Sequence, residues 1–401
     1  MNLNTINPIL LVLFCVLMIL STSSQGILLK LQSNVTVDGS RFEHPFFLTL
    51  IIFMGESLCI FLYLLEKAYL AYRYGRADLS PEMIEAQNKG KRTDINPLLM
   101  AIPMLCDSTA TPLYMLAYIN IPASIGQMMS ALVIFVVALL SILFFGRKYY
   151  RHHWLGLILV FVGICLVAIS ALISSKGSGT TGNVPLGVIL MIFSVFAIGS
   201  QYVVEEKLLS SYYLSPFKAA GWEGITGTIL WCVLLIIFQF IPCEAQICNN
   251  GRLENTSVAF EFMAQSTQLK IFLVGNLLLT ACMSGFSLLV TKYASATAKV
   301  ILKQTKIVIV WLFFLIYRGG GHETFHVLQL IGFVLLCAGI ILFNEIIIIP
   351  VLGFNKNTKA RLTQRRMVSS PSVLKDELSE SLCQSETIYL MNDETENCSS
   401  F

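Results

Sequence analysis

The sequence contains little charge. Only 13% of its 401 residues are Asp, Glu, Lys or Arg, whereas soluble domains carry about 25%. Hydrophobic residues make up 55%, so the chain lacks the polar surface that a water-soluble globule needs. The formal net charge is only +3, which indicates no strongly acidic or basic partner and argues against nucleic-acid binding. A lipid bilayer is therefore the predicted solvent.

Motifs for ATP chemistry are also missing. The chain has no Gly-rich phosphate loop, no Walker motif and no nucleotide-binding domain. This argues against transport driven by ATP hydrolysis in the chain itself. We expect no cofactor.

One pattern typical of an enzyme is present. His322-Glu323-Thr324-Phe325-His326 spells HExxH, in which two histidines four apart on a helix can bind zinc. Here the pattern follows three glycines, and a zinc site needs a third ligand, for which only His44 lies on the same predicted side. We interpret the match as a coincidence and predict neither a metal site nor an enzyme.

Ten apolar stretches are long enough to be membrane-spanning helices, which need about 20 residues each. They cover 8–29, 46–65, 97–118, 122–145, 153–173, 186–204, 217–241, 269–291, 300–317 and 326–348. Their continuous apolar character excludes a β-barrel, whose strands alternate. The predicted fold class is thus an all-α integral membrane protein with ten helices.

The placement of Lys and Arg predicts the orientation. With the N-terminus in the cytosol, most basic residues fall on the cytosolic side, including those of the 66–96 loop. The C-terminus is then cytosolic as well. The first stretch has no basic region before it, which favours a retained helix over a cleaved signal peptide, although cleavage stays an alternative.

The chain divides into two halves of five helices. The predicted domains are 1–173, a luminal linker at 174–185, a second half at 186–350 and a disordered cytosolic tail at 351–401. The glycine pairs Gly156/Gly163 and Gly332/Gly339 have the same spacing, and Ala123-Ser124 resembles Ala296-Thr297. Because five is odd, the second half is inverted relative to the first, a 5+5 inverted repeat as in secondary transporters. The alternative is that the glycines reflect close helix packing alone.

Two sequons and a cysteine pair fall on the predicted luminal side. Asn34 and Asn255 begin Asn-X-Ser/Thr sequences and are predicted to carry glycan. Cys243 and Cys248 share one luminal loop, where an oxidising compartment permits a disulfide.

A series of different short motifs follows along the chain in a characteristic order. They are Gly55-Glu56, Asn96-Pro97-Leu98-Leu99, Cys106-Asp107, Phe145-Gly146-Arg147, Trp154-Leu155-Gly156, Glu205-Glu206-Lys207, Gly221-Trp222-Glu223-Gly224, Gly275-Asn276, Thr291-Lys292 and Leu328-Gln329-Leu330-Ile331-Gly332-Phe333. In these motifs the chain resembles the drug/metabolite transporter superfamily, and more closely solute carrier family 35 subfamily F, the nucleotide-sugar-transporter-like branch. The resemblance implies a ten-helix 5+5 fold, solute transport and an endomembrane location, lysosomal or Golgi-like. The chain departs from close relatives at Ser130, where we expect arginine, and at Lys303, where we expect an acid.

Ionisable and amide side chains within the apolar stretches are candidate substrate-path residues, because such groups are expensive in lipid. The candidates are Glu56, Asp107, Gln127, Gln201, Glu223 and Asn276. The alternative is structural pairing or hydrogen bonding between helices. Glu205 and Glu206 are either part of a gate or solvated charges at a helix end.

Three lysines form a stripe on the ninth stretch. Lys299, Lys303 and Lys306 are four and three residues apart, so they lie within about 60° of one helix face. A lysine at the centre of a membrane helix costs about 2.5–3.5 kcal/mol, which a cavity, an acid or a ligand must compensate. We expect the stripe to face the substrate path, and the alternatives are pairing with Glu56, Asp107 or Glu223 and simple anchoring at the cytosolic side.

The sequence therefore predicts a secondary transporter that works by alternating access on an anionic or phosphorylated small metabolite. Its partners are the solute and the lipid bilayer, and the oligomeric state is left open. A non-transporting membrane interaction protein is the alternative, and an intramembrane metalloprotease a lesser one.

Overall fold

The structure is a computed structural model that describes residues 8–33, 35–37, 40–75, 81–88, 90–92, 96–147, 149–175, 183–243, 251–293, 296–316 and 327–343. Asn34, Cys248, the HExxH sequence and the tail 351–401 lie outside these residues. One compact unit comprises the described residues within Met1–Lys148 and Leu157–Ile340, and it contains every site discussed below. In the second unit, the rings of Tyr149 and His153 pack on Phe343.

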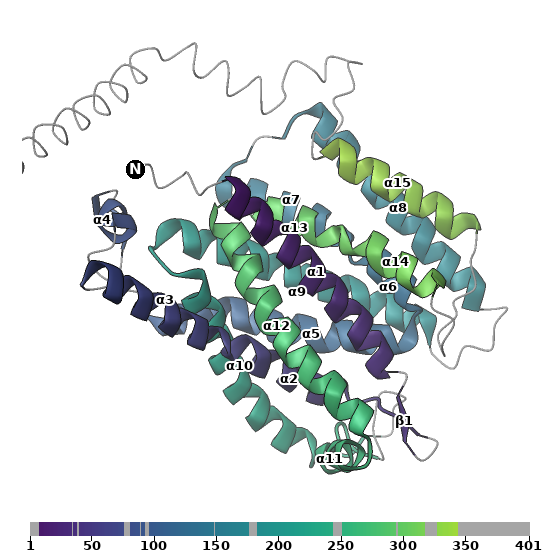
Figure 1. The fold of residues 1–401 in the computed structure, drawn as a ribbon. Coiled ribbons are helices and arrows are strands. Elements are labelled where there is room, and N and C mark those ends of the chain that lie inside the picture. Colours follow the sequence, from purple (N-terminus) through teal and green to yellow (C-terminus); the bar gives the residue numbers. More distant parts are fainter. Residues whose placement is uncertain are drawn as a thin grey trace, which may run out of the picture. The chain divides into compact units, whose positions relative to one another are not determined.

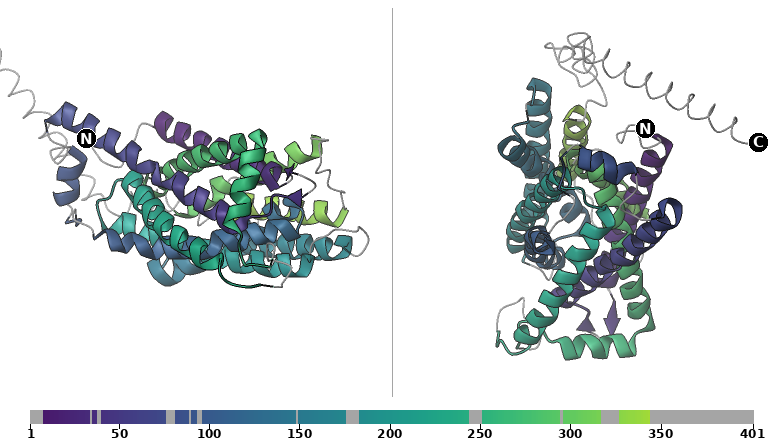
Figure 2. Two further views of the ribbon diagram at one scale, coloured as in Figure 1. Left: turned by 90° about the horizontal axis from the view of Figure 1, so that it is seen from below. Right: turned by 90° about the vertical axis from the view of Figure 1, so that its left-hand side faces the viewer.

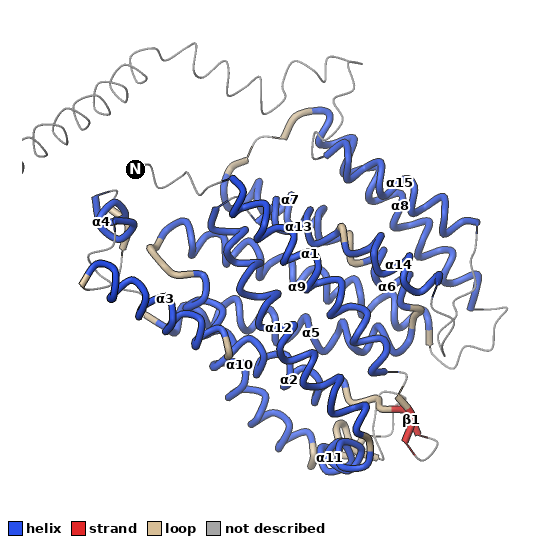
Figure 3. The backbone as a smooth tube through the Cα atoms, in the orientation of Figure 1, coloured by secondary structure: helices blue, strands red, loops and turns tan. Residues whose placement is uncertain are grey.

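The described chain is helical apart from one short ladder (Figures 1 and 3). Its first elements are α1 (Pro8–Ser33), β1 (Thr36–Val37), β2 (Ser40–Arg41), α2 (Pro45–Ser57), α3 (Cys59–Tyr74), α4 (Pro81–Asn88), η2 (Pro97–Met100), α5 (Ala101–Asn120), α6 (Ala123–Met129), α7 (Leu132–Phe145) and α8 (Arg151–Ser175). Then follow α9 (Val184–Ser211), α10 (Pro216–Phe238), α11 (Thr256–Gln265), α12 (Thr267–Tyr293), α13 (Ala296–Gln304), α14 (Lys306–Ile316) and α15 (Val327–Phe343). Strands β1 and β2 pair antiparallel and lie at the same end of the unit as α11 (Figure 2).

Among the described residues, seven helical segments are long and apolar enough to cross a membrane. They are Ile9–Gln32, Pro45–Tyr74, Ile125–Phe145, Arg151–Ser170, Val184–Ser211, Pro216–Phe238 and Thr267–Tyr293, and α15 is a shorter apolar helix. Each of the ten predicted stretches coincides with helix over most of its described residues, but ten spans stay a prediction. The ninth stretch is divided at Thr305 into α13 and α14, each shorter than a span.

Proline and asparagine fix where several helices begin. Proline occupies the first turn of α2, α9 and α10, where its missing N–H costs no helical hydrogen bond. The side chains of Asn183 and Asn255 accept hydrogen bonds from backbone N–H groups at the starts of α9 and α11. These starts separate the predicted stretches from the polar connections between them.

The helices pack in corresponding pairs (Figure 1). α5 packs against α9 as α1 packs against α12, and α7 packs against α9 as α14 packs against α1. α2 contacts α12 as α10 contacts α5, and α2 and α10 pack against each other. For the pairs named here, each contact therefore has a counterpart in which a helix of the second predicted half takes the place of one from the first half.

Two of these helices are interrupted at matching places. The segment 123–145 is divided at Ser130 and Ala131 into α6 and α7, and the segment 296–316 is divided at Thr305. The interruptions touch, because Gln304 Nε2 donates to the Ser130 carbonyl at 3.4 Å and Ser130 Oγ donates to Gln304 Oε1 at 3.5 Å. Ser130, where the resemblance led us to expect arginine, thus lies at this junction.

Glycines allow α10 to approach the backbones of α2 and α3. A Cβ atom at Gly224 would lie 2.1 Å from the Ser57 backbone nitrogen, and one at Gly221 would lie 2.8 Å from that of Ile60. Gly55 is equally close to α12, since its Cβ would meet the Leu277 carbonyl oxygen at 2.5 Å. Only glycine fits these contacts. The close packing brings Glu56, which follows Gly55, and Glu223, which precedes Gly224, into one region.

The glycines of the predicted repeat also lie at a helix contact. Gly163 of α8 and Gly332 of α15 face each other, with a Cβ on either one falling 2.7–2.8 Å from the other's carbonyl oxygen. Both interpretations of the spacing therefore remain compatible with the structure, because residues of a repeat can also serve close packing.

We predict that Gly224→Ala lowers the stability of the protein. The added methyl group overlaps the backbone of α2, and overpacking of this kind costs about 1–3 kcal/mol. The measurement is the melting temperature of the purified protein in detergent. Gly275→Ala is the matched control, because its Cβ would meet only the Leu28 side-chain end at 3.2 Å. Equal melting temperatures for the two variants would contradict the role given to Gly224.

Candidate functional site

A cavity of about 140 Å³ with several charged lining residues lies within the helical unit. Residues from α1, α2, α5, α7, α9, α10, α12, α13 and α14 line it. Its charged lining residues are Glu56, Asp107, Glu205, Glu223, Lys299, Lys303 and Lys306. Its other polar residues include Thr22, Gln25, Thr111, Tyr114, Ser130, Ser194, Gln201, Tyr202, Ser284, Ser287 and Gln304. Both halves of the chain contribute to it.

Most of the residues singled out from the sequence meet in this cavity. Glu56, Asp107, Gln201, Glu223 and the three lysines all line its wall. Gln127 and Asn276 are buried beside it and do not line it. Asn276 is linked to the cavity through Gln25, because the Asn276 Oδ1 accepts from Gln25 Nε2 at 3.5 Å.

Lys299 is held by an ion pair that the sequence analysis did not predict. Its ammonium group donates to the Glu205 carboxylate, and the two residues are 1% and 4% exposed. The same ammonium lies over the ring of Tyr202, 4.0 Å from its centroid. The alternative drawn from the sequence was pairing with Glu56, Asp107 or Glu223. Among the ion pairs that the described residues form, the partner of Lys299 is Glu205, so this alternative is wrong for Lys299.

Glu206 has a partner of its own. Gly146 ends α7 in the left-handed conformation, with φ of 60°, which turns the chain so that Arg147 Nη2 reaches Glu206 Oε1 at 2.7 Å. The reading of Glu205 and Glu206 as solvated charges is therefore wrong. Helix α9 continues to Ser211 and carries both carboxylates into the protein.

The other two lysines carry no carboxylate partner among the described residues. Lys303 Nζ donates to the Tyr202 hydroxyl at 2.9 Å and lies 5.0 Å from the centre of that ring. Lys306 begins α14, and neither it nor Lys303 forms an ion pair with any described residue. Both are half-buried and line the cavity.

The acids on the opposite helices differ in how they are satisfied. Glu56 Oε1 accepts from Ser284 Oγ at 2.7 Å, and Asp107 Oδ1 accepts from Thr111 Oγ1 at 2.8 Å. The Glu223 side chain has no hydrogen bond or ion pair to any described residue, although it is only 4% exposed. The described residues contain no group of three or more His, Cys, Asp or Glu close enough to hold a metal ion.

Uncharged polar residues of the site were missed by the sequence analysis. Gln25 links α1 to α12, because its Nε2 donates to Thr280 Oγ1 at 2.7 Å. Tyr202 lies beneath two lysines as described above. A polar run, Ser21–Gln25, interrupts the apolar pattern of α1 and was a signal for Gln25. No comparable signal marks Tyr202, since tyrosine is common in membrane helices.

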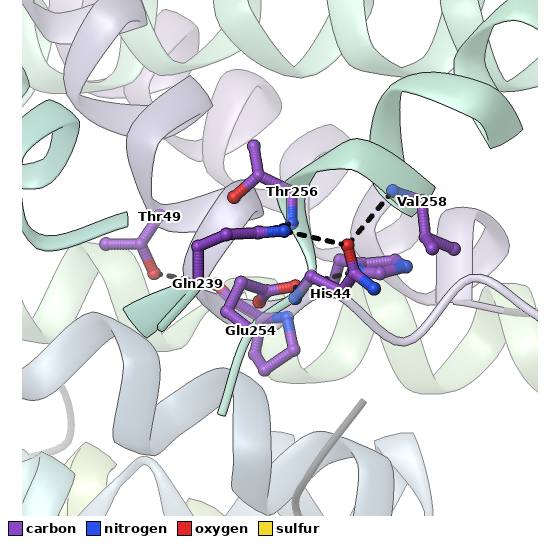
Figure 4. Close-up of polar contacts among 8 residues, drawn as sticks. His44, Thr49, Gln239, Glu254, Thr256 and Val258 are labelled. Atoms are coloured by element: carbon purple, nitrogen blue, oxygen red, sulfur yellow. Dashed lines mark hydrogen bonds and ion pairs between the residues drawn. The ribbon is translucent and has the colours of Figure 1, made fainter. Parts of the chain in front are cut away.

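A second polar cluster joins the start of α2 to the segment before α11 (Figure 4). His44 Nδ1 and Glu254 Oε1 are 2.5 Å apart, and both side chains are buried. Nearby, Gln239 at the end of α10 contacts Asn255 and Thr256 (Figure 4). A small cavity of about 30 Å³ beside His44 shares Leu29, Tyr114 and Met115 with the large cavity. These three side chains therefore form a common wall.

Apolar membrane-length helices around a charged internal cavity define a multi-pass membrane protein with a polar internal site. A sequence profile of the nucleotide-sugar transporter family matches residues 8–216. Solute carrier family 35 member F6 of Homo sapiens is 29% identical over 89% of this chain and 92% of its own length. The protein of the same name from Pongo abelii is 30% identical over 82% of this chain and 87% of its own. The UDP-galactose translocator of Mus musculus is 25% identical over 54% of each chain.

The chain belongs to the nucleotide-sugar transporter family. The resemblance to solute carrier family 35 is thereby confirmed, and the protein is a solute transporter of the membrane.

We predict that Lys299→Ala destabilises the protein, because it leaves the Glu205 carboxylate buried without its cation. Removal of one partner of a buried pair costs about 3–5 kcal/mol. The double variant Lys299→Met, Glu205→Gln should recover much of the lost melting temperature, since it removes both charges. Arg147→Ala is the control and should have a smaller effect, because the Arg147 side chain is 32% exposed. A single variant as stable as the parent would show that the pair does not contribute.

Proposed function

We propose that this protein is a secondary transporter that moves an anionic or phosphorylated small metabolite by alternating access. The central cavity carries the proposal, because it combines two lysines that have no carboxylate partner with helices from both halves of the chain. The family supplies the transport activity, and the cavity supplies the chemistry of the solute.

The packing pattern supports the 5+5 inverted repeat. If the second half repeats the first, α9 corresponds to α1, α10 to α2 and α3, α12 to α5, α13 and α14 to α6 and α7, and α15 to α8. The contacts α5–α9 and α1–α12 then map onto each other, as do α7–α9 and α1–α14, and α2–α12 and α5–α10, while α2–α10 maps onto itself. Inverted repeats with interrupted helices at the substrate site are typical of secondary transporters.

The site also suggests how the two access states differ. The Leu29, Tyr114 and Met115 wall lies between the large cavity and the smaller one beside His44, which pairs with Glu254 in the segment before α11. In a repeat of this kind, rocking of one half against the other opens one end and closes the opposite one. The structure would then represent a state closed at the α11 end.

Lys303 and Lys306 select the charge of the solute. An ammonium group binds a phosphate or carboxylate through charge-assisted hydrogen bonds, which contribute about 1.5–3 kcal/mol each. Tyr202 holds Lys303 in place from one side. A nucleotide sugar, as the name of the mouse relative suggests, is one solute with such a group, and a simple phosphorylated metabolite is another.

We further propose an endomembrane location, with both termini and the 66–96 loop in the cytosol and the α11 end in the lumen. The distribution of Lys and Arg supports this orientation. The tail 351–401 would then extend into the cytosol as the proposed disordered segment.

The test of transport is uptake into liposomes that contain the purified protein. The external solution holds a mixture of nucleotide sugars, nucleoside monophosphates, sugar phosphates and organic acids, and the vesicle content is read by mass spectrometry. We predict uptake of an anionic solute, reduced about tenfold or more by Lys303→Ala or Lys306→Ala, as loss of one charge-assisted contact implies. Lys270→Ala, an exposed lysine of α12 outside the cavity, is the control. Full uptake in the double variant, or uptake only of cations, would refute the proposed solute class.

The orientation is tested by glycosylation. Asn255 Oδ1 is engaged in hydrogen bonds, and no described residue binds its Nδ2, the atom to which a glycan attaches. We predict a mobility shift on glycosidase treatment that is lost in the Asn34→Gln, Asn255→Gln variant. A C-terminal tag should be digested by protease added to sealed vesicles, and a protected tag would overturn the orientation.

A further inference from the structure

The buried glutamates of the site differ in one respect. Glu205 and Glu206 are 4% and 7% exposed, and each is paired with a cation, Lys299 and Arg147. Glu223 is as buried as they are and lines the cavity, yet it has no hydrogen bond or ion pair to any described residue. An ionised carboxylate without a partner is costly to bury. Glu223 therefore needs a positive partner that the described side chains do not provide.

The position of Glu223 limits what that partner can be. Gly221 and Gly224 flank Glu223 on α10, carry no side chain that could pair with it, and lie against the backbone of Ile60 and Ser57. The titratable groups that face it are mostly acidic or thiol groups. They are Glu56 on α2, Cys59 on α3, Cys106 and Asp107 on α5, Glu205 on α9, and Lys299 and Lys303 on α13. From α12 the cavity receives only uncharged groups such as Ser284.

A metal ion does not fit this arrangement. Among the described residues, no three carboxylates, histidines or cysteines lie close enough together to coordinate one. Lys299 is paired with Glu205, and Lys303 donates to the Tyr202 hydroxyl. A proton needs no coordination shell and neutralises a carboxylate within its own volume.

We infer that Glu223 is a proton-binding site, and that the proton bound there is carried together with the solute. This inference rests on the proposed function for its second part. With Glu223 ionised, the cavity holds four carboxylates against three lysines, which opposes entry of an anion. Protonation of Glu223 removes one negative charge from the cavity wall, so it favours the anion at Lys303 and Lys306. By linkage the bound anion favours the proton equally, and the two are loaded together.

The proton site is tested without any solute. An apolar carbodiimide reacts with protonated carboxyl groups in apolar surroundings, and mass spectrometry locates the product. We expect labelling of Glu223 to rise at least about threefold as the pH falls from about 8 to about 5, since the protonated form accumulates as pH falls. Glu205 and Glu206 are internal controls of the same burial, and their cations should keep their labelling low throughout. Labelling of Glu223 that does not change with pH, whether high or low, would overturn the proton site.

Coupling is tested in the liposomes described above, with a pH gradient imposed across the membrane. Uptake should rise severalfold when the outside is acidic relative to the inside. Glu223→Gln, which imitates the protonated side chain, should still exchange solute but no longer respond to the gradient. A gradient response that persists in this variant would overturn the coupling. If no solute enters at all, the proposed function fails, while the carbodiimide result still decides whether Glu223 binds a proton.

Discussion

The close contact between α2 and α10 is the constraint on which the site depends. Gly224 places the two backbones so near that no Cβ fits between them, and Gly221 lies equally tightly against Ile60 of α3. The residues next to these glycines, Glu56 and Glu223, consequently enter the same cavity from helices that lie far apart in the sequence. Charged groups inside a membrane protein are tolerated where they face such a cavity, so the packing of the two helices creates the electrostatics of the site.

The charged residues of the cavity come from two sets of helices. Helices α13 and α14 bring ammonium groups, one of them neutralised by Glu205, and α2, α5 and α10 bring carboxyl groups. Two of these carboxyls are stabilised by a hydroxyl donor and one is not. The interruption at Thr305 matters here, because it separates Lys303 from Lys306 while both remain at the cavity wall.

The sequence predicted the helices and much of the charged lining for simple physical reasons. Lipid requires long apolar runs, and an ionisable residue within such a run stands out, as Glu56, Asp107 and Glu223 do. Partners could not be predicted, since helical periodicity tells which residues share a face but not which helix meets that face. Lys299 therefore paired with Glu205, whereas the alternative drawn from the sequence had named Glu56, Asp107 or Glu223. The break at Thr305 was equally hidden, because neither glycine nor proline marks it, and Tyr202 and Ser284 were missed because such residues serve as ordinary hydrogen-bonding groups between helices.

The two consecutive glutamates of α9 have a consequence for the speed of the transport cycle. Glu205 binds α13 through Lys299, whereas Glu206 binds the end of α7 through Arg147, so a single turn of α9 is fastened to both interrupted segments. The Glu205–Lys299 pair is buried away from water, and separating its charges inside a low-dielectric bundle is expensive. Motion of α13 away from α9 must therefore cross an activation barrier unless water or another charge replaces the partner during the movement. The Glu205–Lys299 pair between α9 and α13 would then slow the transport cycle. The Glu206–Arg147 pair, whose arginine is partly open to solvent, would separate first.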